Sequence, residues 1–201
     1  MIRRQVLTIG AAALAALLTV TACSSGNQAA TSSSTSAGTS AASSSAPAAQ
    51  AHNQADVTFA QDMIPHHQQA VQMSDIMLGK QGIDPRVVQL ANQIKAAQGP
   101  EIQQMQGWLS QWGQPTMSMA PGMVMPGMLA DPDISALQNA QGADASKLFL
   151  TGMIQHHQGA IAMAQDEIKS GQNPPAVALA HSIVTSQQQE INTMQTILGS
   201  L

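Results

Sequence analysis

The chain has 201 residues, a formal net charge of −4 and 44% hydrophobic residues, which predicts one domain with appendages. An acidic chain without a basic patch excludes the nucleic-acid-binding class of proteins. The only cysteine is Cys23, which excludes an internal disulfide, so soft metal ligands must come from the 13 methionines.

Residues 1–22 are expected to be a lipoprotein signal peptide. A basic start at Arg3 and Arg4 precedes an apolar run, residues 9–20, that is too short for a transmembrane helix. The sequence VTAC, which ends at Cys23, resembles a bacterial lipobox. It implies cleavage before Cys23 and a lipid on its sulfur. We therefore expect an exported cell-envelope lipoprotein that is anchored to the outer face of the plasma membrane.

Residues 23–55 are predicted to form a tether. After the lipidated Cys23 they consist almost entirely of Ser, Ala, Thr, Gly, Gln and Asn. Such a segment has too little apolar surface to fold, and it would hold a domain away from the membrane as a flexible chain. His52 lies in this segment and is interpreted as an incidental linker residue.

The folded part, residues 56–201, contains an internal repeat. The sequence MIPHHQQAVQM starts at Met63, and MIQHHQGAIAM starts at Met153, 90 positions later. Further along, the segment around Glu101 matches the segment around Glu190. This pattern indicates one helical hairpin that has been duplicated, with repeats at about 57–112 and 144–198 and a crossover at 113–143.

Start and stop signals predict two helices in each repeat. The first helix covers about 57–79 and ends at Gly79, and Asp84-Pro85 provides an N-cap and a first-turn proline for the second, which runs to about Trp112. In the second repeat, Asp144 is expected to cap a helix that ends near Gly171, and Asn173-Pro174 starts the last helix, which runs to about Leu198.

Strand patterns are absent from the sequence, which has no Tyr and two Phe. Two short-looped hairpins joined by one long connection predict an all-α fold, a four-helix bundle of the ferritin-like kind. Pro65 falls inside the first helix and would kink it or free a backbone carbonyl group.

Four of the six histidines form two adjacent pairs, His66-His67 and His156-His157. On a helical wheel each pair straddles the centre of the apolar stripe of its helix. A single buried histidine is usually a satisfied core residue. Two duplicated pairs that face the same interior, with methionines at the same offsets, instead favour a metal site. His181, by contrast, is expected to face solvent.

Each repeat also places one glutamate, Glu101 or Glu190, in an otherwise apolar stripe, which is costly unless the carboxylate is paired or bound to metal. Di-iron bundles combine such glutamates with two Glu-x-x-His motifs, whereas here the motif is Met-x-x-His, starting at Met63 and Met153. Thioether and imidazole ligands favour copper, especially Cu(I). The glutamates are interpreted as acceptors for the far N–H of a liganding histidine or as structural partners of histidine, with direct ligation as the alternative.

The crossover is rich in methionine, and its sequence is too interrupted by proline to form a helix over that stretch. We interpret it as an accessory Cu(I)-binding loop. The alternative is an apolar cover in which methionine is used for its adaptability. The methionines concerned are Met117, Met119, Met123, Met125 and Met128.

The stretches FAQDMIPHHQQAVQM and FLTGMIQHHQGAIAM, together with the matching segments around Glu101 and Glu190, resemble the bacterial domain of unknown function 305. The resemblance covers essentially all of residues 56–201. It implies a ferritin-like fold, export, and a link to copper binding and copper tolerance. Carried over by position, it implies these metal ligands: Met63, His66, His67, Met73, Met153, His156, His157 and Met163.

We therefore expect a lipid-anchored copper-binding protein for sequestration, tolerance or transfer, with Cu(I), Cu(II) or both as cargo. Its partners would be copper ions, the membrane through Cys23, and an unidentified copper donor or acceptor protein. No catalytic constellation is visible, so an enzyme is not expected. Two alternatives stay open: a metal-dependent oxidase or reductase on a ferritin-like bundle, and a metal-free helical interaction module whose His–Glu pairs hold the core together.

Overall fold

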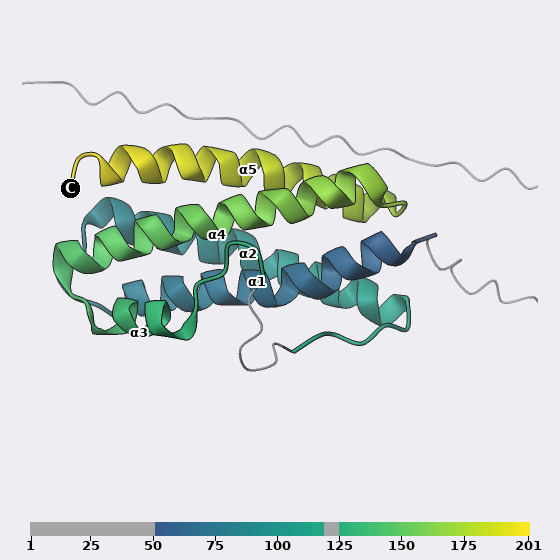
Figure 1. Ribbon diagram of the computed structural model, residues 1–201, viewed down its shortest axis with the longest axis horizontal. Coiled ribbons are helices and arrows are strands. Elements are labelled where there is room, and N and C mark those ends of the chain that lie inside the picture. Colours follow the sequence, from purple (N-terminus) through teal and green to yellow (C-terminus); the bar gives the residue numbers. More distant parts are fainter. Residues whose placement is uncertain (1–50, 119–124) are drawn as a thin grey trace, which may run out of the picture. The chain divides into compact units, whose positions relative to one another are not determined.

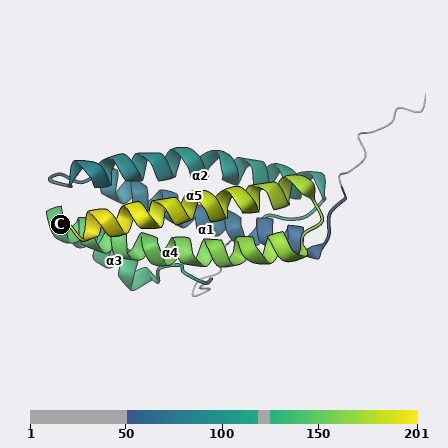
Figure 2. The same ribbon diagram turned by 90° about the horizontal axis from the view of Figure 1, so that it is seen from above.

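A computed structural model describes residues 51–118 and 125–201, and over these residues all regular structure is helical. The helices are α1 (Gln54–Leu78), α2 (Pro85–Gln111), α3 (Asp131–Asn139), α4 (Gly142–Ser170) and α5 (Pro174–Leu198). The four long helices form the hairpins α1–α2 and α4–α5, which pack together mainly through α1 and α4 (Figures 1 and 2). The prediction of an all-α four-helix bundle is confirmed.

Several predicted features lie outside the described residues. These are the signal peptide, the lipidated Cys23, most of the tether, and Met119 and Met123 of the crossover. None of the helices in the described ranges combines the length and the apolar character that a membrane span requires. The predictions for the signal peptide and the lipid anchor therefore stay predictions.

The first helix begins at Gln54, a few residues before the predicted start. The Asn53 side chain accepts hydrogen bonds from the backbone N–H groups of Ala55 and Asp56, and the Asp56 carboxylate accepts one from the Asn53 N–H in return. This capping box adds a turn to the helix at the end of the segment assigned to the tether. His52, interpreted as an incidental linker residue, stacks on Trp112, with 4.7 Å between the ring centroids.

The other helix starts agree with the sequence except at α4. Asp84 and Asn173 accept backbone hydrogen bonds at the starts of α2 and α5, as predicted. The prediction that Asp144 caps α4 is wrong, because α4 begins at Gly142 and Asp144 already lies in its first turn. A carboxylate in the first turn still interacts favourably with the helix dipole, which explains why the residue looks like a start signal. Helix α1 continues through Pro65.

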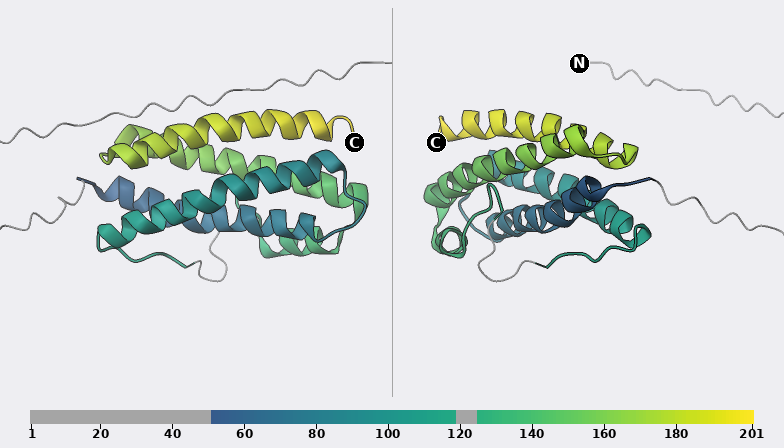
Figure 3. Two further views of the ribbon diagram at one scale, coloured as in Figure 1. Left: turned by 180° about the vertical axis from the view of Figure 1, so that it is seen from behind. Right: turned by 45° about the vertical axis from the view of Figure 1, so that its right-hand side comes forward.

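The short helix α3 lies in the crossover, for which the sequence predicts one long connection and no helix of its own. Its nine residues begin with Asp131-Pro132, a helix-start pattern, and they bury Ile134 and Leu137 against the bundle. Two apolar residues three positions apart are too few to establish a helical period from sequence. Figure 3 shows α3 beside one end of the bundle, where it covers parts of α1 and α4.

The histidine pairs lie where two hydrophobic clusters of the core meet. Along α1, Met63 and Ile64 belong to one cluster, whereas Ala70 and Met73 belong to the other. The order is reversed along α4. Its buried residues before the histidines, such as Phe149, belong to the cluster of Ala70 and Met73, and its buried residues after them, such as Ala160, belong to the cluster of Met63 and Ile64. This reversal follows from the opposite directions of α1 and α4, which are visible in Figure 1. The histidines therefore occupy the middle of the bundle.

Candidate metal centre

The two histidine pairs come together at the contact between α1 and α4. All four imidazoles are completely buried. The rings of His66 and His156 face each other, with 3.7 Å between their centroids and 39° between their planes. Two adjacent residues on a helix point about 100° apart, so His67 and His157 turn away from this central pair toward the second helix of their own hairpins.

The outer histidines are each paired with the glutamate of the same repeat. The Nε2 of His67 lies 2.9 Å from Oε2 of Glu101, and the Nε2 of His157 lies 2.6 Å from Oε2 of Glu190. An ionised carboxylate can only accept, so the histidine donates from Nε2 and its Nδ1 keeps a lone pair. The structure thus shows a His–Glu hydrogen bond in each repeat, which two of the three interpretations of these glutamates share.

Five imidazole nitrogens have no hydrogen-bond partner. They are the Nδ1 atoms of His66, His67 and His157 and both nitrogens of His156. Burial, followed by the neighbouring His67, lowers the pKa of His66 to about 3. Burial, followed by His66, lowers the pKa of His156 well below its usual value. The central rings are therefore neutral, and neutral imidazole is the form that binds metals.

Unpaired buried nitrogens are costly in a core, and each one needs a physical explanation. A bound soft cation would provide that explanation, because it accepts the lone pairs that no N–H group reaches. Among the described residues, however, no three side chains of the His, Cys, Asp and Glu types converge as a metal site. Thioethers, which are soft ligands that suit Cu(I), are therefore candidates to complete a site with the imidazoles.

The structure brings the predicted thioether ligands to this region only in part. Met63 and Met153 are fully buried one helical turn before the histidines of their own helices. Met73 is also fully buried, but it lies six and seven residues after the histidines of its helix. Met163 is only partly buried and lines a cavity of about 350 Å³ near the start of α1 and the end of α4. Met63 and Met153 therefore lie closer to the histidine pairs along their helices than Met73 and Met163 do.

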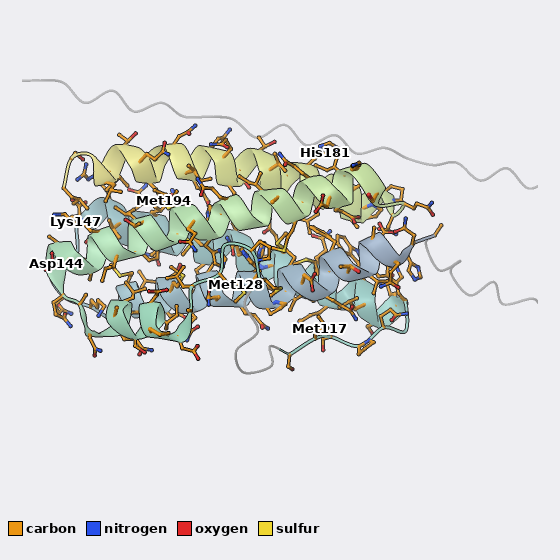
Figure 4. All side chains as sticks on the ribbon, viewed as in Figure 1. Met117, Met128, Asp144, Lys147, His181 and Met194 are labelled. Carbon is orange, nitrogen blue, oxygen red and sulfur yellow. The ribbon has the colours of Figure 1, made fainter. Side chains whose placement is uncertain are left out.

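The described methionines of the crossover differ in their surroundings. Met117 is 38% exposed and lies in the extended segment after α2 (Figure 4), whereas Met125 and Met128 are buried. The segment that holds the two buried methionines contacts the histidines directly, since the carbonyl oxygen of Pro126 lies 3.1 Å from Nε2 of His66. The sequence analysis missed this carbonyl, because backbone acceptors carry no residue-type signal. His181 is exposed on α5, as predicted.

The comparison with protein families gives one match that covers the whole bundle. The model of the family "Domain of unknown function (DUF305)" matches residues 56–198. A DUF305 fragment from Deinococcus radiodurans is 34% identical, with a TM-score of 0.68, and the alignment covers 74% of this chain and 98% of that one. A DUF305 protein of Streptomyces coelicolor that is described as secreted is 36% identical, with a TM-score of 0.68 and coverage of 73% and 93%.

Another similar solved structure carries a metal in its description. CopM in its Cu(I)-bound form is 32% identical, with a TM-score of 0.62, over 72% of this chain and 96% of that chain. CopM is also known in Cu(II)-bound and Ag-bound forms. An uncharacterized protein of Acanthamoeba polyphaga mimivirus is 44% identical over 52 residues, which is 26% of this chain and 34% of the viral protein.

Proposed function

The chain belongs to the DUF305 family, and we propose that it is an extracytoplasmic protein that binds copper through imidazole and thioether ligands and sequesters it or passes it on. The observation that carries this proposal is the group of five unpartnered nitrogens on four buried, central histidines. The Cu(I), Cu(II) and Ag forms of CopM support it, because a related bundle holds the soft ions that these ligands prefer.

The neutral central pair, His66 and His156, would provide the imidazole ligands that the two repeats share. Met63 and Met153 precede them by three residues on their helices and would add thioethers. Glu101 and Glu190 would orient the outer histidines by accepting their Nε2–H groups, which leaves Nδ1 available. The imidazole and thioether ligands are all uncharged. Such a set suits Cu(I) and gives up its ion more readily than thiolates would.

The proposal places the bundle outside the cytoplasm. The predicted signal peptide, the lipidated Cys23 and the Ser-rich tether support this placement, as does a related protein that is described as secreted. A lipid at Cys23 would keep the copper site near the outer face of the plasma membrane. There it could intercept copper ions or exchange them with a donor or acceptor protein.

The first test is a competition titration of the signal-free chain with Cu(I) and a chelator of known affinity, in the absence of oxygen. The His66→Ala/His156→Ala double variant should bind Cu(I) at least about a hundredfold more weakly, because it loses two ligands. The matched control is His181→Ala, which removes an exposed histidine and should bind as the wild type does. The proposal fails if the wild type cannot compete with a weak chelator, or if the double variant binds as well as the control.

A further inference from the structure

Residues 125–129, called the strap here, contact α1 through His66 and Gln69 and contact α4 through its glycines. Figure 4 labels Met128 of the strap. Pro126 accepts a hydrogen bond from His66, and Met125 and Met128 are only 8% and 7% exposed. The Gln69 side chain fixes the far end of the strap with two hydrogen bonds. Its Nε2 donates to the Leu129 carbonyl at 2.9 Å, and its Oε1 accepts from the Leu129 N–H at 2.8 Å.

The strap packs closely against α4 because the two α4 residues that face it, Gly152 and Gly159, have no side chain. A Cβ atom on Gly159 would overlap the Pro126 carbonyl group, and one on Gly152 would lie 2.8 Å from Cδ2 of Leu129. Gly127 of the strap itself has a φ of 82°, and a Cβ there would lie 2.6 Å from the carbonyl oxygen of Gln155. Strap and helix backbones are therefore in direct contact, which only glycine permits.

These contact positions are among those at which the two repeats differ. Shifted by 90 residues, Gln69 corresponds to Gly159, and Asp62 corresponds to Gly152. The repeat on α1 thus has a side chain that clamps the strap, while the repeat on α4 has gaps that accommodate it. The chain has one strap for two repeats, so each repeat makes different contacts with it. These differences at Gln69 and Gly159 are consistent with those different contacts.

The strap makes the central histidines unequal. His66 must carry its proton on Nε2 to donate to the Pro126 carbonyl, so Nδ1 is its only free nitrogen. No strap residue forms a hydrogen bond with His156, which keeps both nitrogens unpartnered. The hydrogen bond therefore fixes the tautomer and the orientation of His66, whereas no hydrogen bond from the strap selects a tautomer of His156.

We propose that the strap is the retention element of the copper site: it positions His66 with Nδ1 toward the ion, and its undocking limits copper release. Gln69 and Gly159 are the positioning residues that hold it in place. The part of this inference that concerns the rate of copper release rests on the proposed copper function. The docking itself can be measured in the metal-free protein, so the two ideas can fail separately.

The experiment compares Gln69→Ala and Gly159→Ala with Gly107→Ala in the signal-free chain. Gly107 is a helical glycine on α2, and a Cβ atom added to it would meet nothing within 4 Å, so it controls for the general effect of alanine in a helix. The metal-free readouts are hydrogen exchange of the Leu129 amide and the tautomer of His66 by nitrogen NMR. The kinetic readout is the rate at which Cu(I) passes to an excess of chelator.

Both strap variants should speed exchange at Leu129 and mix the His66 tautomers. Gln69→Ala should release Cu(I) about tenfold faster, on the order of the factor expected from losing two ordinary hydrogen bonds. Gly159→Ala should release it at least as fast, because its Cβ atom would overlap the Pro126 carbonyl group. Gly107→Ala should match the wild type in all three. Unchanged exchange and tautomer in both strap variants would overturn the docking, and altered docking with an unchanged release rate would overturn the retention role. If the wild type binds no Cu(I), the proposed function and the retention role both fail, but the docking is still decided.

Discussion

The imidazoles of His66 and His156, which lie at equivalent positions of the two repeats, face each other with 3.7 Å between their centroids. When two copies of a motif pack against each other in a twofold arrangement, equivalent residues meet only near the twofold axis. The duplication therefore creates one central histidine pair to which both repeats contribute.

Methionine can serve in this core as a ligand or as packing, and a leucine substitution separates these roles. Met63→Leu/Met153→Leu nearly conserves volume, so the free energy of unfolding should fall by less than about 1.5 kcal/mol for each substitution. Cu(I) affinity should nevertheless fall at least about tenfold, because two thioethers are lost. Met77→Leu is the control, since Met77 is equally buried on α1 but lies near its end. Equal Cu(I) affinity in all three proteins would mean that these methionines only pack.

The His–Glu pairs predict a second separation of binding from stability. Glu101→Gln/Glu190→Gln should weaken copper binding by about 10–100-fold, because the charged carboxylates that orient the outer histidines are replaced by weaker, neutral amide acceptors. Glutamine has nearly the shape of glutamate and keeps one oxygen that can accept the Nε2–H group, so thermal unfolding should change little. Titration and melting of the same samples measure both effects. A loss greater than that of His67→Ala/His157→Ala would indicate direct ligation by the glutamates.

Asp56 connects the start of α1 to the turn between α4 and α5. Its carboxylate accepts hydrogen bonds from the N–H groups of Asn53 at 2.6 Å, Gln172 at 3.0 Å and Asn173 at 2.8 Å. Asp56→Ala leaves these donors without their acceptor and should lower the free energy of unfolding by about 2–4 kcal/mol in urea denaturation. Asp133→Ala, at an exposed position of α3, should cost well under that. Equal costs would show that the connection contributes nothing specific.

Glu167 predicts a pH dependence of stability. Burial, followed by the nearby Asp56 carboxyl, raises the pKa of Glu167 from 4.5 to about 8. Between these values the folded state holds a proton that the unfolded state releases, so this group makes stability fall as pH rises. Glu167→Gln, which stays neutral, should therefore raise the melting temperature at pH 8 by on the order of 5 °C and change it little near pH 4.5.

Melting curves of wild type and Glu167→Gln across this pH range provide the measurement. The decisive quantity is the difference in melting temperature between the two proteins, because groups that do not contact Glu167 titrate in both of them. Burial alone would raise the pKa of Asp56, but the N–H groups of Asn53 and Asn173, the Glu167 side chain and the N–H group of Gln172 lower it instead. A difference that is constant with pH would refute the assignment to Glu167.

Much of the fold follows from the sequence alone. The duplicated motif, the caps at Asp84 and Asn173, and the apolar stripes with their single glutamates all act within one helix or one hairpin. Local hydrogen bonds and helical periodicity decide such features, so they are legible in a linear chain. The short helix α3 and the true start of α4 escape sequence analysis because their signals are weak or ambiguous at short range.

The site itself depends on contacts that only the tertiary structure decides. The sequence indicates that four histidines face the interior and that two glutamates share it, but not which ring meets which. The packing of α1 on α4 selects His66 and His156 as the central pair and leaves His67 and His157 to the glutamates. The Pro126 carbonyl and the glycines that admit it act through backbone atoms and empty space, for which residue types alone give no pattern.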